Sequence, residues 1–150
     1  MTRPDITLTP AEQRALLSEP LKAALATVDA DGFPHIVAMS FLARDDGAIY
    51  MTSYAKAQKV LNVRRNPKVA VMIETGQQYA EFHAVMVRGR CEVIEDRALV
   101  EETMHGIAAK RSERQSTPGG AATSAPKRVV LKIVPEKLTS WDHRKLGGRY

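Results

Sequence analysis

Two hydroxyl side chains and two lysines lie close together in the middle of the sequence, where they could bind a phosphate group. Thr52 and Ser53 end a run of strand-forming residues, and Lys56 and Lys59 follow. On a helix, lysines three residues apart share one face, and Asn62 continues that row by a further turn. Free backbone N–H groups at a helix start, together with ammonium groups, favour a bound anion. The structural alternative is that the hydroxyls cap the helix and the lysines are solvated.

A strand, a short helix and a second strand would position these groups. Residues 48–53 have the pattern of a strand, residues 57–65 that of a helix, and residues 69–74 that of the next strand. The pair Asn66-Pro67 ends the helix, because the residue before a proline is pushed out of the helical region.

The residues around this helix also resemble a known family. The run KVLNVRRNP (residues 59–67), followed by a strand, resembles the pyridoxamine-5′-phosphate-oxidase-like split barrels, and more closely their flavin/deazaflavin oxidoreductase branch. The ending SWDHRKL (residues 140–146) is similar to the C-terminal signature of some deazaflavin-dependent reductases in that branch. The resemblance covers roughly residues 21–146.

The resemblance implies a fold and a site. The implied fold is mainly β, a six-stranded antiparallel split β-barrel with flanking helices, and two chains are expected to form a homodimer with two equivalent cofactor clefts at the interface. The family's flavin-type ring lies beside the strand that holds Ala38, Met39 and Ser40. The C-terminal segment lies near the cleft, so the resemblance makes Trp141 and Arg144 contacts of cofactor or substrate. A packing role for the tryptophan is the alternative.

Sequence patterns predict the remaining elements of one domain over residues 1–150. Six strands are expected over residues 21–28, 35–42, 48–53, 69–74, 82–95 and 127–134. The strand 35–42 is apolar on both faces, as in a central barrel strand, and Gly89 predicts a bulge or a close backbone approach. Residues 1–20 hold an N-terminal helix that begins after Thr9, and a further helix runs from an Asp96 cap to residue 113.

Two segments are expected to lie outside regular structure. Residues 115–126 are rich in Gly, Ser and Ala and are predicted to form a mobile loop. The basic pairs Lys110-Arg111 and Lys127-Arg128 flank this region, either solvated or leaning over a bound anion. Pro135 is expected to end the last strand, which leaves residues 135–150 as a C-terminal tail.

Composition argues against several classes of function. The net charge of +5 is spread along a chain with only 5% aromatic residues, so nucleic-acid binding is a weak interpretation. A single cysteine, Cys91, excludes an intramolecular disulfide and a multi-cysteine metal site, and Asp142-His143 alone make no metal site. Without a long apolar run or an apolar leader, we expect a cytoplasmic protein with no membrane partner.

The family resemblance implies an oxidoreductase that transfers a hydride between a flavin-type cofactor and a small organic molecule. No catalytic residue can be identified, in keeping with chemistry that belongs to the cofactor. FMN requires a phosphate clamp and a ring platform, and the deazaflavin F420 also requires positive charge for its acidic oligoglutamate tail. The SWDHRKL ending and five cations around the predicted phosphate clamp favour F420, with FMN as the alternative. The cations are Lys56, Lys59, Arg64, Arg65 and Lys68. A split barrel that stores the cofactor without turnover is a further alternative.

Overall fold

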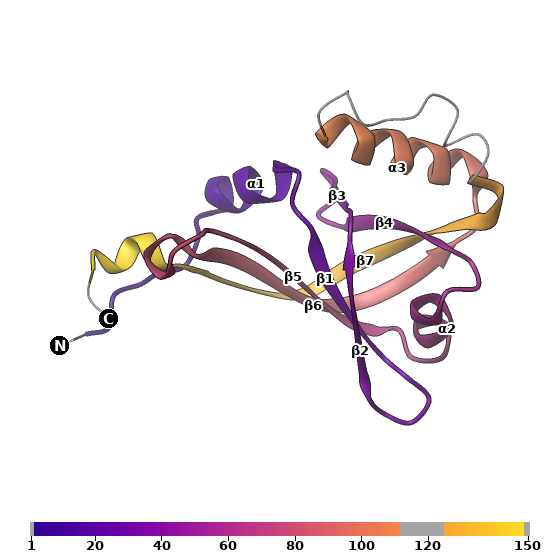
Figure 1. Cartoon of the computed structure of the whole chain (residues 1–150), viewed down its shortest axis with the longest axis horizontal. Helices are drawn as coiled ribbons and strands as arrows, with labels where there is room; N and C mark the ends of the chain where they lie inside the picture. The colour runs from indigo at the N-terminus through magenta and orange to yellow at the C-terminus, as the bar shows by residue number, and fades with distance from the viewer. Residues whose placement is uncertain (1, 112–124, 149–150) are drawn as a thin grey trace.

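A curled, seven-stranded antiparallel sheet forms the centre of the molecule (Figure 1). The computed structural model describes residues 2–111 and 125–148. The strand order is β2-β1-β5-β6-β7-β4-β3. The strands are β1 (Ala23–Val28), β2 (Pro34–Met39), β3 (Leu42–Ala43), β4 (Ile49–Tyr54), β5 (Lys68–Thr75), β6 (His83–Ile94) and β7 (Arg128–Asp142). The helices are α1 (Pro10–Ser18), α2 (Gln58–Arg65) and α3 (Arg97–Lys110), with 3₁₀ turns η1 (Tyr79–Glu81), η3 (Ala125–Lys127) and η4 (His143–Leu146).

The core lies on the inner side of the curled sheet, where α1 and α2 cover it. Leu25, Val71 and Leu131 are fully buried strand residues of this core, and alternation along each strand sends their neighbours to the other face. Leu16 of α1 and Val60 of α2 pack into the same cluster. The prediction of a mainly β split barrel with flanking helices is therefore confirmed.

The edge strand differs from its prediction. The expected strand 35–42 is interrupted at Ser40 and Phe41, so it becomes β2 and the two-residue strand β3. The described residues therefore hold seven strands rather than six. β2 is also an edge strand and not a central one. Its second apolar row is accordingly uncovered within the chain, with Ile36 68% exposed.

The long β6–β7 ladder continues past the point where the last strand was expected to end. Pro135 lies within β7, opposite Gly89, and pairing continues to Asp142. The register shifts between Arg88 and Gly89, so a bulge absorbs the extra residue. A Cβ atom on Gly89 would lie 2.1 Å from the carbonyl oxygen of Val134. The predicted bulge and close approach are confirmed, whereas the predicted end at Pro135 is wrong.

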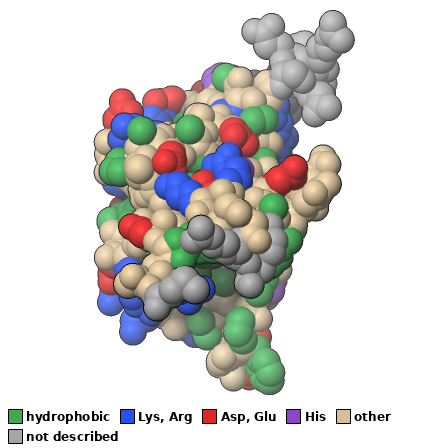
Figure 2. All heavy atoms as spheres, turned by 90° about the vertical axis from the view of Figure 1, so that its left-hand side faces the viewer, with side chains coloured by type: hydrophobic (Ala, Val, Ile, Leu, Met, Phe, Trp, Pro, Cys, Tyr) green, Lys and Arg blue, Asp and Glu red, His purple; other side chains and the backbone are tan. Residues whose placement is uncertain are grey.

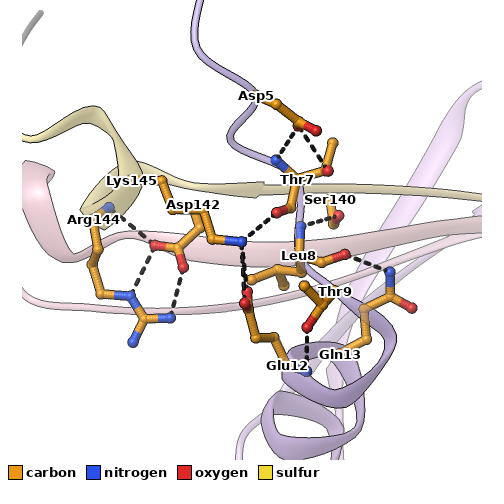
Figure 3. A network of polar contacts seen from close by, with 10 residues as sticks. All are labelled: Asp5, Thr7, Leu8, Thr9, Glu12, Gln13, Ser140, Asp142, Arg144 and Lys145. Atoms are coloured by element: carbon orange, nitrogen blue, oxygen red, sulfur yellow. Dashed lines mark hydrogen bonds and ion pairs between the residues drawn. The ribbon is translucent and has the colours of Figure 1, made fainter.

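Hydrogen bonds join the N-terminal segment to the end of β7 and to η4 (Figure 3). The Leu8 N–H donates to Ser140 Oγ at 2.9 Å, and Lys145 Nζ donates to the Thr7 carbonyl at 2.6 Å. The same ammonium group lies 2.8 Å from a carboxylate oxygen of Glu12. Thr9 caps α1 by accepting from the Glu12 N–H, as predicted. The segment before α1 and the end of β7 with η4 are thus held together at one end of the molecule (Figure 1).

Acidic and basic side chains are interspersed on the end of the molecule that faces the viewer in Figure 2. Of the predicted loop 115–126, residues 115–124 lie outside the described residues, and the last two belong to η3. Within residues 2–111 and 125–148, no helix is long and apolar enough to cross a membrane.

Candidate anion-binding cleft

A cleft of about 410 Å³ opens where β2 and β4 end, between α2 and α3. Six of the predicted site residues line it: Ala38, Met39, Ser40, Thr52, Ser53 and Lys59. They come from three elements, because the strand-to-helix connection after β4 lies beside the interrupted end of β2. The structure therefore brings the expected ring platform and the expected phosphate clamp to one cavity, in the size range of ligand pockets.

The start of α2 lacks a side-chain cap. Ala57 is the N-cap residue and its side chain makes no hydrogen bond, so the first N–H groups of the helix have no side-chain acceptor. The Thr52 and Ser53 hydroxyls do not cap the helix, and Ser53 Oγ instead donates to the Tyr54 carbonyl at 3.2 Å. The structural alternative, in which these hydroxyls serve as caps, is not what the structure shows.

Two cations at this end of the cleft have no acidic partner. Among the ion pairs of the described residues, none includes Lys59 or Arg128. Burial, aided by repulsion from the Arg128 guanidinium, holds the pKa of Lys59 below its usual range. Arg128 lies over the Tyr54 ring, 4.2 Å from its centroid, and its Nε is buried without a hydrogen-bond partner. A bound anion would satisfy both groups, so the donor set fits a phosphate.

Two other residues predicted for this clamp do not line the cleft. Lys56 is exposed in the turn before α2 and does not share a helix face with Lys59. Asn62 is fully buried; its amide donates to Thr27 Oγ1 at 2.9 Å and accepts from Gln58 Nε2 at 2.8 Å. The contact with Thr27 anchors α2 to β1, which fixes the position of Lys59.

Trp141 and Arg144 lie at the other end of the same chain. Trp141 pairs with Ala84 near the end of β7, directly before η4, and η4 lies at the opposite end of the long axis from α2 and α3 (Figure 1). The Arg144 guanidinium donates two hydrogen bonds of 2.8 Å to the carboxylate of Asp142 (Figure 3). These bonds are the main reason that the pKa of Asp142 is lowered. One chain alone does not place this pair at the cleft.

The cleft also has walls that the sequence prediction did not assign to it: Tyr54, Met104, Ile107, Ala108, Arg111 and Arg128. The three α3 residues belong to a helical apolar stripe that predicts core packing, and partial exposure of Met104 and Ala108 is not readable from periodicity. Arg111 and Arg128 belong to the two basic pairs that flank the predicted loop in the sequence. Their convergence on one cavity depends on the fold.

The fold and the cleft together define a split-barrel protein with a site for an anionic ligand. The sequence profile of the pyridoxamine 5′-phosphate oxidase family matches residues 9–142. The chain belongs to this family of flavin-binding split-barrel oxidoreductases. No curated protein matches the sequence.

Three solved structures illustrate the relationship. The conserved hypothetical protein Rv2991 from Mycobacterium tuberculosis is 31% identical, with a TM-score of 0.87 over 100% of this chain and 94% of that one. A protein named F420 reductase is 26% identical, with a TM-score of 0.68 over 84% of this chain and 94% of that one. A Listeria innocua protein, provisionally named a pyridoxamine 5′-phosphate oxidase, is 28% identical, with a TM-score of 0.65 over 87% and 95% of the two chains.

Proposed function

We propose that this chain is an oxidoreductase that binds a flavin-type cofactor in the cleft and exchanges a hydride with a small organic acceptor. The observation that carries the proposal is the cleft itself, in which Lys59, Arg128 and the uncapped start of α2 lie near the β2 residues Ala38 and Met39. The cofactor supplies the hydride chemistry when bound. The residues of the chain bind it, orient it and exclude water.

Each group at the clamp has a definite role in this proposal. Lys59 and Arg128 neutralise a phosphate, and the first N–H groups of α2 donate to its oxygens. Thr52 supplies a hydroxyl donor from the end of β4, and Ser53 can supply a second one by exchanging its hydrogen bond to the Tyr54 carbonyl for one to the phosphate. Asn62 acts indirectly, by holding α2 against Thr27. Met39, only 8% exposed, gives the platform beside the ring a fixed position.

F420 is favoured over FMN on two grounds. The chain is similar to a protein named F420 reductase, and its SWDHRKL ending resembles that of deazaflavin-dependent reductases. The count of cations around α2 supports the choice less than the sequence suggests. Arg64 pairs with Glu95 at 3.0 Å and Arg65 donates to the Val28 carbonyl at 2.9 Å, so both are engaged elsewhere.

The outer face of the sheet favours a homodimer. Strand registers align Ala38, Ala24, Met72 and Met86 in one row across β2, β1, β5 and β6. The adjacent row holds Ile36, Ala26 and Ala70. This row pair, called the alanine face below, is uncovered in the single chain, with Met72 38% exposed. The second row continues to the exposed Arg88, which borders the face. An exposed apolar face of this kind is typical of an interaction surface, and a second copy is the partner we propose.

A dimer through the alanine face would bring the two distant parts of the site together. Trp141 pairs with Ala84, two residues from Met86, and therefore lies on the same outer side of the sheet. Ala38 belongs both to the alanine face and to the cleft. If the two-fold axis runs along β5, β2 of one protomer lies over β7 of its partner. In that arrangement the partner's C-terminal segment reaches the cleft.

The test is a titration of the apoprotein with F420 and with FMN, in which visible absorption reports binding. A spectral change that saturates at micromolar F420, with weaker binding of FMN, is expected. Reduced cofactor bound to the protein should then be oxidised by quinone-type acceptors. Binding without oxidation by any acceptor would indicate storage, and no binding of either cofactor would overturn the proposal.

A further inference from the structure

A second group of cations gathers around Ser40, at the break between β2 and β3. Lys22 Nζ donates to Ser40 Oγ at 2.8 Å, and the Arg111 guanidinium donates to the same oxygen. Ser40 and Arg111 line the cleft, and both also line an adjoining hollow of about 20 Å³ together with Lys22. We call Lys22, Ser40 and Arg111 the Ser40 cluster.

The Ser40 cluster is positively charged without a counterion in the described residues. None of the ion pairs there includes Lys22 or Arg111. Partial burial, with repulsion from Arg111, lowers the pKa of Lys22. Because the lone pairs of Ser40 accept from the two cations, its own proton is directed elsewhere and can be donated to a ligand. Two cationic donors and one hydroxyl donor form a set that a carboxylate or phosphate satisfies.

A structural role accounts for a neighbouring cation but not for the Ser40 cluster. Lys110 donates to the carbonyls of Leu17 and Phe41, at 2.9 and 3.2 Å, and so ties the last turn of α3 to two other segments. Within the described residues Lys22 makes no such carbonyl contact, and it comes from a separate segment before β1. Its position beside Arg111 brings two like charges together, which is unfavourable unless an anion lies between them.

The wall of the cleft beside the Ser40 cluster is apolar. Met104, Ile107 and Ala108 of α3 line the same cavity. A ligand that touches both surfaces must therefore combine an apolar body with an anionic group.

We propose that the Ser40 cluster binds the carboxylate or phosphate group of the acceptor, so that the acceptor is an organic anion with an apolar body. The identification of this anion as the acceptor rests on the proposed function, whereas anion binding at the cluster does not. The other source of the same chemistry is the oligoglutamate tail of F420, and the experiment separates the two.

The first experiment needs no cofactor. Apoprotein is titrated with 1-naphthoate and with the neutral 1-naphthamide, and binding is followed by NMR at the amides of Lys22, Ser40 and Arg111. Since a hydrogen bond to a charged group contributes roughly 1.5–3 kcal/mol, we expect the anion to bind at least about 10-fold more tightly than the amide. Lys22→Met and Arg111→Met should each remove most of that preference.

Arg14→Met is the matched control, because Arg14 is an exposed arginine on α1 and does not line the cleft. It should keep the preference for the anion, and thermal melts should show that all three variants fold. Equal binding of the acid and the amide to wild-type protein would overturn the proposal. So would a preference that survives in both cluster variants.

The second experiment assigns the anion to its source. Affinity for F420 is compared with affinity for the same deazaflavin phosphate lacking the glutamate tail, in wild type and in Arg111→Met. An acceptor site predicts that the variant binds both forms as wild type does. A loss of affinity confined to the tailed form would show that the cluster binds the cofactor's tail and would overturn the assignment to the acceptor. If neither cofactor binds but the naphthoate preference remains, the proposed function fails and the anion site stands.

Discussion

Lys59 is a partly buried cation whose neighbours in the cleft are hydroxyl donors and a second cation, Arg128. Charge-assisted hydrogen bonds contribute roughly 1.5–3 kcal/mol each, so Lys59→Ala should weaken cofactor binding by about 10- to 150-fold. Lys59→Arg should cost less, because it keeps the charge and changes only its geometry. A cofactor titration beside a thermal melt of each apoprotein measures both effects.

Lys56 provides the control for Lys59. The sequence gives both lysines the same role, but Lys56 is exposed and does not line the cleft. Lys56→Ala should therefore leave affinity within about twofold, since a solvated charge contributes little. If the two alanine variants lose affinity equally, the clamp extends beyond the cleft as described.

Cys91 is the chain's single cysteine, and its thiol should be inert in the folded protein. Burial, with a smaller effect of Glu92, raises the pKa of the Cys91 thiol to about 12. The unfolded thiol ionises near its ordinary pKa of about 8.5, so the folded form is disfavoured as pH rises from there towards 12. The free energy of unfolding should fall by up to about 1.4 kcal/mol per pH unit in that window.

Cys91→Ala should flatten this decline, which urea titrations at pH 8, 9 and 10 would measure. A thiol reagent at pH 8 should react at least about 100-fold more slowly with native protein than with unfolded protein. Fast reaction of the native thiol would contradict the burial on which the prediction depends.

At the scale of elements, Gly89 decides whether β6 and β7 can remain paired as far as Trp141. Its missing Cβ leaves room for the Val134 carbonyl, which would lie 2.1 Å from that atom. Both sides of the contact are backbone, so Gly89→Ala must shift a strand and should lower the free energy of unfolding by roughly 1–3 kcal/mol or more. Chemical denaturation measures this. Glu92→Ala, an exposed change on the same strand, should stay within about 0.5 kcal/mol, and similar values for both variants would contradict the close approach.

The elements that could be predicted from sequence are those whose causes are local. The side chains of Thr9 and Asp96 cap α1 and α3 by accepting from the backbone N–H three residues later, and both helix starts were predicted. Pro135 was misread because its place in β7 depends on a bulge at Gly89, a residue distant in sequence. The contacts of Ser40, at the break between β2 and β3, likewise come from residues distant in sequence, Lys22 before β1 and Arg111 after α3.

At the scale of the molecule, the cleft could be predicted only in part. Ala38, Met39 and Ser40 followed from the resemblance, and Lys59 from its place in a strand–helix connection. The α3 wall could not be foreseen, because a helical stripe looks the same whether it meets a core or the edge of a cavity. How the C-terminal segment relates to the cleft depends on assembly, which one chain does not contain.

Assembly through the alanine face can be tested by placing a charge on it. Met72 points away from the core and is 38% exposed, so Met72→Glu should leave the fold intact while burying a carboxylate in the proposed interface. Sedimentation at micromolar protein should give a dimer for wild type and a monomer for the variant. Ala109→Glu, a charge on an exposed position of α3, is the control and should remain dimeric. A wild-type monomer at this concentration would contradict the shared cleft.

The fluorescence of Trp141, the single tryptophan of the chain, can report whether its contact with bound cofactor depends on the dimer. Within one chain it lies at the η4 end, away from α2 and the cleft (Figure 1). A cofactor bound at Lys59 should therefore quench Trp141 only when a partner's β7 covers the cleft. Saturating cofactor should quench or shift the emission of the wild-type dimer and of Ala109→Glu. It should leave the emission of monomeric Met72→Glu unchanged. Absorbance measures separately that cofactor binds to this monomer. Unchanged emission in the saturated wild-type dimer would give Trp141 a packing role.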